Sequence, residues 1–292
     1  MQRRLLVVLA FLLVFVTAAC DPLATPSGPA PLRYRDDVFS TVTKTADITY
    51  GSAENLSGQT VTLKMDLYRP AGDTVTSRPA IVWVHGGSFC CGSKTSPEIV
   101  DQANVFARKG YVTASISYRL EPGGCTGSVP VETCIGAVGE AREDAQTAVR
   151  FLRSQATNYG IDSTRIAIGG TSAGAITALN VGYTPDNPGT GDHQGYSSSV
   201  RAVQSLSGGM LASGPIDAGD APALLFHGTA DNLVPYSWAV ATTDQAKAAG
   251  LVAVLRTWEG AGHVPYTQNR QQILDETRNF FYSQMNLANA AR

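Results

Sequence analysis

The sequence predicts an α/β fold with a mostly parallel sheet, two antiparallel strands at its start and helices on both faces of the sheet. Three observations lead to this prediction. Short apolar runs of strand length alternate with longer stretches of helical periodicity, as they do in β-α-β units. The first two strand-like segments instead follow each other across a short polar turn. The chain has 292 residues, of which 43% are hydrophobic, and this suits one large domain.

The two opening strands are expected at 45–50 and 60–68. Apolar and polar residues alternate along both segments, which is the pattern of a strand with one buried face. Residues 52–59 between them are polar and are expected to form the turn. The two strands should therefore pair antiparallel at the start of the domain.

The later elements alternate between strand and helix. The remaining strands are expected at 79–84, 111–118, 165–169, 200–206, 222–227 and 251–258. The helices are expected at 97–109, 140–159, 175–180, 236–249 and 267–285. This order implies a mainly parallel sheet, because each crossover carries a helix back over the sheet. The loops that remain, including 207–221, are too short for a cap domain, so no cap is expected.

The N-terminus resembles a secretory signal. Arg3 and Arg4 precede an unbroken apolar stretch at 5–16, which has the length of a signal core and is shorter than a membrane span. Small residues then precede Cys20, a pattern similar to the lipobox of bacterial lipoproteins. We expect residues 1–19 to be a signal peptide and Cys20 to carry lipid, the alternative being cleavage after Ala19 with Cys20 free. Either way the protein is expected to be extracytoplasmic, as a cell-envelope lipoprotein or a secreted protein.

Residues 20–44 are expected to be a flexible tether, since the stretch 21–31 is rich in proline. Residues 45–292 would then form the folded domain. The formal net charge is −2 and no block of basic residues is present, which disfavours nucleic-acid binding. Membrane contact is expected only through the N-terminal lipid anchor.

Four further cysteines follow in the chain. Because an exported protein favours disulfides, Cys90, Cys91, Cys125 and Cys134 predict two bridges with three alternative pairings. The first two follow one strand and the last two follow the next, so bridges between the two loops are favoured. The alternative is a ring closed by Cys125 and Cys134, with a vicinal or reduced pair at Cys90 and Cys91. A zinc site is disfavoured, because no C-x-x-C pair and no nearby histidine are present.

The segment 170–174, Gly-Thr-Ser-Ala-Gly, joins the strand at 165–169 to the helix that follows. A G-x-S-x-G between a strand and a helix is typical of a nucleophile elbow. The turn is so tight that a side chain two residues before or after the serine would collide with backbone. Ser172 is held strained, its hydroxyl is exposed, and the first amides of the helix point at whatever it attacks. Ser172 is therefore the predicted nucleophile.

A serine hydroxyl becomes a good nucleophile only when a base takes its proton and a third group orients that base. Among the four histidines, His263 is the best base, because it lies in a glycine-containing loop just after the last strand. Asp231 is the best acid, because it too lies just past a strand end. His227 is expected to be structural and hydrogen-bonded, and His193 is expected to be exposed to solvent.

Amide donors for a developing oxyanion are expected at two places. One is Ala173, the residue after the nucleophile. The other is the turn His85-Gly86-Gly87-Ser88, where residues without side chains let the amides approach a substrate closely. Which of these loop amides is the second donor stays open at this point. His85 is expected to hydrogen-bond within the turn and to fix it.

Together, in this order and each at a strand end, these motifs resemble the α/β-hydrolase fold esterases. The resemblance is to the carboxylesterase and hormone-sensitive-lipase-like branch with an HGG-type oxyanion motif, and it covers roughly residues 45–285. The chain departs from this branch at Ser88, where a third glycine is common, and in the expected lack of a cap. The resemblance implies a nucleophile, an acid, a base and oxyanion amides at Ser172, Asp231, His263, Gly86, Gly87 and Ala173.

The expected function is hydrolysis of carboxylic esters through an acyl-enzyme, without a metal or another cofactor. Without a cap the pocket should be shallow and open. This favours short-acyl esters, or esters borne on a polymer such as an acetylated or feruloylated polysaccharide. Two alternatives remain, which are a serine peptidase of the prolyl-oligopeptidase type and a non-catalytic exported binding module with the same fold.

Overall fold

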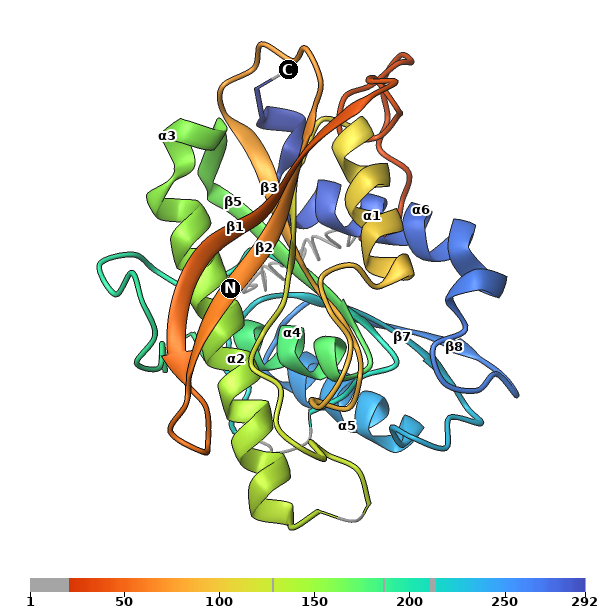
Figure 1. Cartoon of the computed structure of the whole chain (residues 1–292). Helices are drawn as coiled ribbons and strands as arrows, with labels where there is room; N and C mark the ends of the chain where they lie inside the picture. The colour runs from red at the N-terminus through yellow and green to blue at the C-terminus, as the bar shows by residue number, and fades with distance from the viewer. Residues whose placement is uncertain (1–20, 128, 186, 211–213, 292) are drawn as a thin grey trace, which may run out of the picture.

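The computed structural model describes residues 21–127, 129–185, 187–210 and 214–291. At its centre, these residues form one eight-stranded sheet in the order β1-β2-β4-β3-β5-β6-β7-β8 (Figure 1). The strands are β1 (Val42–Glu54), β2 (Thr60–Pro70), β3 (Arg78–Val84), β4 (Val112–Ile116), β5 (Ile161–Thr171), β6 (Val203–Leu206), β7 (Ala223–Gly228) and β8 (Ala253–Trp258). β2 pairs antiparallel with β1 and β4, and every other neighbouring pair is parallel. The predicted fold class is confirmed.

Helices cover both faces of this sheet (Figure 1). On one face lie α1 (Pro97–Arg108) and α6 (Tyr266–Gln284). On the other face lie α2 (Val131–Ser154), α4 (Ala173–Tyr183) and α5 (Tyr236–Ala248). The short helix α3 (Ala156–Tyr159) follows α2, and the 3₁₀ turn η1 (Leu287–Asn289) follows α6. Each face of the sheet therefore has its own hydrophobic core.

The central strand β3 shows how the sequence produces these two cores. All seven of its residues are buried. Ala80, Val82 and Val84 belong to the core on the side of α2 and α4, whereas Ile81 and Trp83 belong to the core beneath α1 and α6. Successive side chains of a strand point to opposite faces, so the stretch 80–84, covered on both faces, is apolar at every position.

Helix α2 begins at Val131, nine residues earlier than the expected start at 140. Gly136 and Gly139 lie in its first turns and weaken both its helix propensity and its apolar pattern. The start signals that remain are Pro130, directly before the helix, and Glu132 in its first turn. The loop between β4 and α2 is correspondingly shorter than the expected helix start implied.

The prediction of a flexible tether over 20–44 is wrong for its second half. Leu32 and Tyr34 are buried, with exposed fractions of 5% and 0%. The Tyr34 hydroxyl donates a hydrogen bond of 2.6 Å to a backbone carbonyl near the C-terminus. Further toward the N-terminus, the Asn279 side chain donates to the Leu23 carbonyl oxygen at 2.8 Å. Prolines in this stretch indicated a linker, but its few apolar side chains dock on the core beside α6.

The predicted signal peptide at 1–19 and the predicted lipidation site Cys20 lie outside the described residues. Within the described ranges, no helix combines the length and the apolar character that crossing a membrane requires. Between β6 and β7, the described residues 207–210 and 214–221 form neither helix nor strand. The rim of the sheet next to Ser172 is therefore bordered by loops in this part of the chain.

Candidate active site

Ser172 lies on the turn between β5 and α4, with φ 56° and ψ −120°. This left-handed conformation is strained for a residue with a side chain. The turn is enforced by its surroundings, because a Cβ on Gly170 would lie 2.2 Å from the carbonyl oxygen of Gly174. A Cβ on Gly174 would in turn lie 2.1 Å from the carbonyl oxygen of Val84. Both glycines of the G-x-S-x-G pattern are thus required by space.

The structure brings Ser172, His263 and Asp231 together in one hydrogen-bonded chain. The Ser172 Oγ lies 2.8 Å from the His263 Nε2, and the His263 Nδ1 lies 2.8 Å from the Asp231 Oδ2. Asp231 follows β7 and His263 follows β8, so both come from the carboxyl edge of the sheet. The imidazole therefore lies between a hydroxyl and a carboxylate, each within hydrogen-bond distance.

Asp231 is buried, with an exposed fraction of 8%. Its Oδ1 accepts hydrogen bonds from the amides of Leu233 (2.9 Å) and Val234 (3.0 Å). Its Oδ2 accepts from His263 and lies 3.1 Å from the Nε2 of His227. Burial opposes ionisation of this carboxyl, but the hydrogen bonds from His263 and the two amides outweigh it and lower the pKa of Asp231. The carboxylate is thus held charged and fixed in place.

The other three histidines make structural contacts. His227 is buried, and its Nε2 also lies 3.0 Å from the Val234 carbonyl oxygen, so it supports the loop that carries the acid. The Nδ1 of His85 lies 2.6 Å from the Gly86 carbonyl oxygen, as expected for a residue that fixes the turn. Burial lowers the pKa of His85 to about 4, which keeps it neutral at pH 7. His193 is half-buried and contacts a β1 carbonyl at 3.1 Å, so the expectation of an exposed residue is wrong.

The predicted oxyanion amides lie on two segments that flank the serine. A Cβ on Gly86 would lie 3.1 Å from the Cβ of Ser172, so this loop passes directly beside Ser172. Gly87 has φ +122°, and a Cβ there would lie 2.1 Å from the carbonyl oxygen of Cys91. Ala173 is the first residue of α4. Within the described ranges, the hydrogen bonds leave the N–H groups of Gly86, Gly87 and Ala173 without an acceptor.

A pocket of about 470 Å³ opens beside Ser172. It is lined by Ser88 and Phe89, by the segment that carries Cys125 and Cys134, by the start of α4, and by residues between 232 and 238. Among the described residues, none of the side chains that line it is charged. Large apolar side chains contribute most of the wall, namely Phe89, Ile176, Leu233, Val234 and Trp238. The pocket is therefore suited to an uncharged group.

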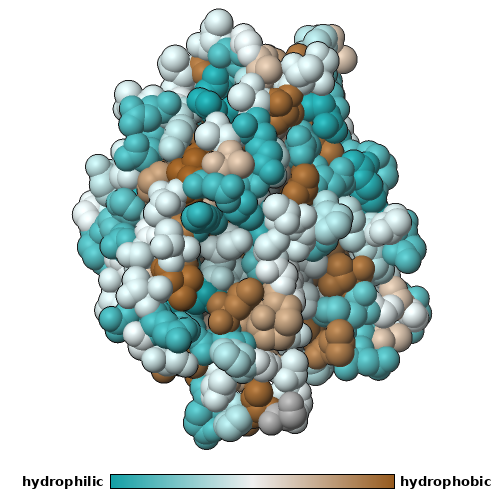
Figure 2. All heavy atoms as spheres, viewed as in Figure 1, coloured by the Kyte–Doolittle hydropathy of each residue, from teal (hydrophilic) through white to brown (hydrophobic). Residues whose placement is uncertain are grey.

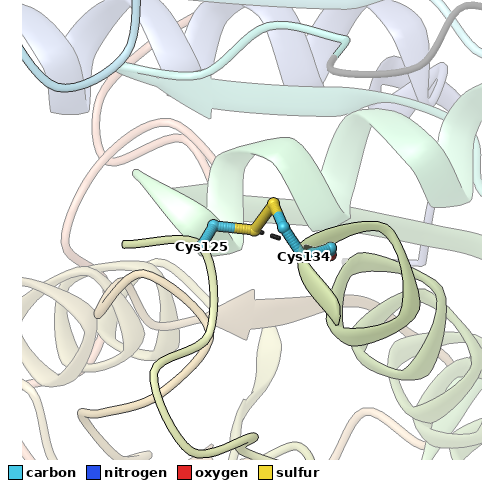
Figure 3. Close-up of a disulfide and its surroundings, with 2 residues drawn as sticks. All are labelled: Cys125 and Cys134. Carbon is cyan, nitrogen blue, oxygen red and sulfur yellow. Dashed lines mark hydrogen bonds between the residues drawn. A yellow bond between two sulfur atoms is a disulfide. The ribbon is translucent and has the colours of Figure 1, made fainter. Parts of the chain in front are cut away.

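The cysteine pairing differs from the one that the sequence favoured. Cys125 and Cys134 form a disulfide, which Figure 3 shows between a loop and the first turn of α2. Cys90 and Cys91 are thiols whose sulfur atoms lie 2.9 Å apart. The favoured bridges between the two loops are thus wrong, and the alternative of a small ring is confirmed. The reason is the early start of α2, which brings the Cα of Cys134 to 4.5 Å from that of Cys125.

Comparison with known proteins extends this picture. A family model described as BD-FAE matches residues 65–209, and one described as Phospholipase/Carboxylesterase matches residues 141–280. The solved structure of Thermogutta terrifontis esterase 2 phosphonylated by sarin is 25% identical with a TM-score of 0.68, and the match covers 89% of this chain and all of that one. The chain has the α/β-hydrolase fold and is similar to esterases of that fold over most of its length. A propionate-bound structure of the thermophilic Thermogutta terrifontis esterase gives the same identity and TM-score, over 84% of this chain and 95% of that one.

Curated relatives of this chain match over shorter stretches. Lipase 1 of Geotrichum candidum is 30% identical over 130 residues, which are 43% of this chain and 23% of the lipase. Phenmedipham hydrolase of Pseudarthrobacter oxydans is 32% identical over 42% of this chain and 23% of that protein. The chain spans only about a quarter of the length of these two relatives.

Sequence reasoning missed the part of the pocket formed by Leu233, Val234 and Trp238. Leu233 and Trp238 line it, yet they lie in a short segment that the sequence indicated only as the region around the acid. A signal for Leu233 and Val234 was present, because this apolar pair lies two residues past Asp231 in a loop at the carboxyl edge of the sheet. Leu233 is 72% exposed, which is unusual for a leucine that also lines a pocket.

Proposed function

We propose that this chain hydrolyses carboxylic esters through an acyl-enzyme formed on Ser172. The observation that carries the proposal is the hydrogen-bonded chain Ser172–His263–Asp231, with both of its hydrogen bonds at 2.8 Å. In the tautomer with a proton on Nδ1, the imidazole donates to the carboxylate and accepts the serine proton at Nε2. This is the proton path that an alkoxide-like nucleophile requires.

In this mechanism Ser172 attacks the ester carbonyl while His263 takes its proton. Asp231 keeps the imidazole oriented and stabilises the imidazolium that forms. The amide of Ala173 and an amide of the Gly86-Gly87 turn donate to the oxyanion, and each such donor contributes on the order of 3 kcal/mol to lowering the barrier. The imidazolium then protonates the leaving alcohol, and water cleaves the acyl-enzyme by the reverse proton path.

We propose uncharged esters with a short acyl group as the substrates, either free or attached to a polymer. The pocket beside Ser172 holds about 470 Å³ and has no charged side chain, so a charged group would lose hydration there without gaining a partner. Structures of the Thermogutta terrifontis esterase are described with butyrate and with propionate bound. Leu233 is exposed at the pocket and would contact the part of a larger substrate that remains outside.

A panel of p-nitrophenyl esters with acyl chains of increasing length tests this function, together with esters that vary the alcohol. We expect turnover of short-acyl esters that is lost in Ser172→Ala. A preference for long acyl chains would contradict the short-acyl assignment. Faster turnover of a matched peptide amide than of the ester would favour a peptidase. A folded protein that cleaves neither would favour a binding module.

Export of the protein remains a proposal that rests on the N-terminal sequence alone. We propose that residues 1–19 direct secretion and that Cys20 becomes the lipidated first residue. Mass spectrometry of the mature N-terminal peptide from a bacterial host tests this, with Cys20→Ala as the control. A lipid-sized mass increase that disappears in the control is expected. A soluble form that begins at Cys20 and carries no lipid would contradict it.

A further inference from the structure

The disulfide between Cys125 and Cys134 forms part of the wall of the pocket beside Ser172. Both cysteines line the pocket, and so do Thr126 and Gly127 between them. Figure 3 shows the bridge running from the loop before α2 to the first turn of that helix, next to α4. The helix α4 carries the lining residues Ala173 and Ile176. The sulfur atoms are therefore placed where they limit the width of the pocket.

Around Thr126 and Gly127, the described residues of this loop are held mainly by local hydrogen bonds. Inside the loop, the hydrogen bonds of Gly124, Thr126 and Val129 go to residues three positions earlier, so they hold only local turns. Thr126 and Gly127 are themselves exposed to solvent. The disulfide adds a cross-link between this segment and the first turn of α2, across a sequence separation of nine residues.

The same loop also packs against the oxyanion turn. The amide of Cys125 donates to the Ser88 carbonyl oxygen at 2.8 Å, and the amide of Glu121 donates to the Phe89 carbonyl oxygen at 2.9 Å. A Cβ on Gly124 would lie 2.0 Å from that Ser88 oxygen, so the two backbones touch. Ser88 and Phe89 have φ values of 52° and 62°, a conformation that residues with side chains keep only when their surroundings hold it.

We propose that the Cys125–Cys134 disulfide determines substrate specificity by fixing the wall formed by Cys125, Thr126 and Gly127. This inference rests on the proposed ester hydrolysis. With the bridge closed, a substrate group must fit between this wall on one side and Leu233 and Trp238 on the other, so the wall limits the size of that group. With the bridge open, the loop moves outward and the pocket accepts larger groups. The disulfide acts on the size of the pocket, and the catalytic groups Ser172 and His263 are untouched by it.

The experiment compares kcat/KM across two ester series, one lengthening the acyl chain and one enlarging the alcohol. The test variant is Cys125→Ser with Cys134→Ser. The matched control is Cys90→Ser with Cys91→Ser, which removes the same number of cysteines and leaves the bridge intact. In the test variant we expect the preference for small over large groups to fall about tenfold in one of the two series, since each methylene in a fitted pocket changes selectivity by roughly this factor or more. The control should keep the wild-type preference.

Reduction of the folded protein gives a second measurement that does not depend on how the variant folds. A dithiol reductant transfers two electrons to the bridge, so that Cys125 and Cys134 each gain a proton and the reductant becomes a cyclic disulfide. The wild type and the Cys90/Cys91 control should lose selectivity on reduction. The serine variant should start with low selectivity and stay there.

The outcomes separate this inference from the function on which it rests. If esters are cleaved but the bridge-free variant and the reduced wild type keep the full preference for small groups, the inference is wrong and the hydrolase assignment stands. If wild-type protein cleaves no ester in either series, the proposed function itself fails. A loss of kcat for all esters alike, with unchanged selectivity, would assign the disulfide to support of the oxyanion turn and would overturn its role in specificity.

Discussion

Replacement of Asp231 by asparagine tests the proton path most specifically. The carboxylate Oδ2 lies 2.8 Å from the His263 Nδ1, which donates to it, and 3.1 Å from the His227 Nε2, which also lies 3.0 Å from the Val234 carbonyl oxygen. In Asp231→Asn, the remaining oxygen can stay on the amides of Leu233 and Val234, which places the new NH₂ group against the two imidazoles. An NH₂ group favours the His263 tautomer that accepts at Nδ1, and in that tautomer Nε2 carries a proton and cannot take one from Ser172.

The expected magnitude is large for turnover and modest for stability. A wrong tautomer in a Ser-His-Asp triad lowers kcat by about 10⁴-fold, which corresponds to roughly 5 kcal/mol of barrier. The two amide hydrogen bonds remain, so the free energy of unfolding should fall by only about 1–3 kcal/mol, the cost of an unpaired buried donor.

The assay is kcat for a short-acyl p-nitrophenyl ester, with urea unfolding of the same sample to confirm that it is folded. Asp244→Asn is the matched control. It makes the same chemical change at a residue that is exposed on α5, away from the imidazoles. A folded Asp231→Asn protein with kcat within tenfold of wild type would refute the reasoning.

Three further predictions follow from single contacts. Gly87→Ala should abolish most turnover, because the new Cβ would lie 2.1 Å from the Cys91 carbonyl oxygen. The control Gly58→Ala, whose Cβ would meet nothing within 4 Å, should keep wild-type turnover. Equal kcat values for the two variants would contradict this prediction. Burial lowers the pKa of His85 to about 4, so His85 stays neutral in the folded protein. Above about pH 6.5 the free energy of unfolding does not depend on this residue's protonation, and as pH falls toward 4 stability is lost because the unfolded chain takes up the proton first. Urea unfolding should show that the free energy of unfolding falls between pH 7 and pH 4.5, and that His85→Phe reduces this fall by at most roughly 3 kcal/mol. An unchanged pH dependence in His85→Phe would exclude His85 as its source. Opening the Cys125–Cys134 ring should lower the free energy of unfolding by roughly 2–3 kcal/mol, and a change below about 0.5 kcal/mol would show that the loop is held by other contacts.

The fold and the three residues of the hydrogen-bonded chain were accessible from sequence for a physical reason. Ser172, Asp231 and His263 each follow an apolar strand, and the carboxyl ends of parallel strands meet at one edge. Local patterns that mark strand ends thus fix where side chains converge, even when they are far apart in sequence. The glycines around Ser172 added a steric constraint that few other folds impose.

Features that depend on long-range packing were not accessible in this way. The pairing of Cys125 with Cys134 depends on where α2 begins, and glycines in its first turns concealed that start. Leu32 and Tyr34 lie in a proline-rich stretch, and only the core beside α6 explains their burial. In the lower part of the view in Figure 2, brown hydrophobic residues are visible over the region where Figure 1 places α4, α5 and the start of α2. Val131, at the start of α2, is 69% exposed. Assigning this residue to a loop or to a helix from the sequence does not explain why an apolar side chain is exposed there.

Covalent labelling with a fluorophosphonate tests the central claim most directly, because the reagent bonds to a serine oxygen only when a neighbouring base takes the proton. The wild-type protein should gain the mass of one phosphonyl group, peptide mapping should place it on residue 172, and His263→Ala should label far more slowly. Folded wild-type protein that stays unlabelled, or that carries the adduct on a different serine, would contradict the account.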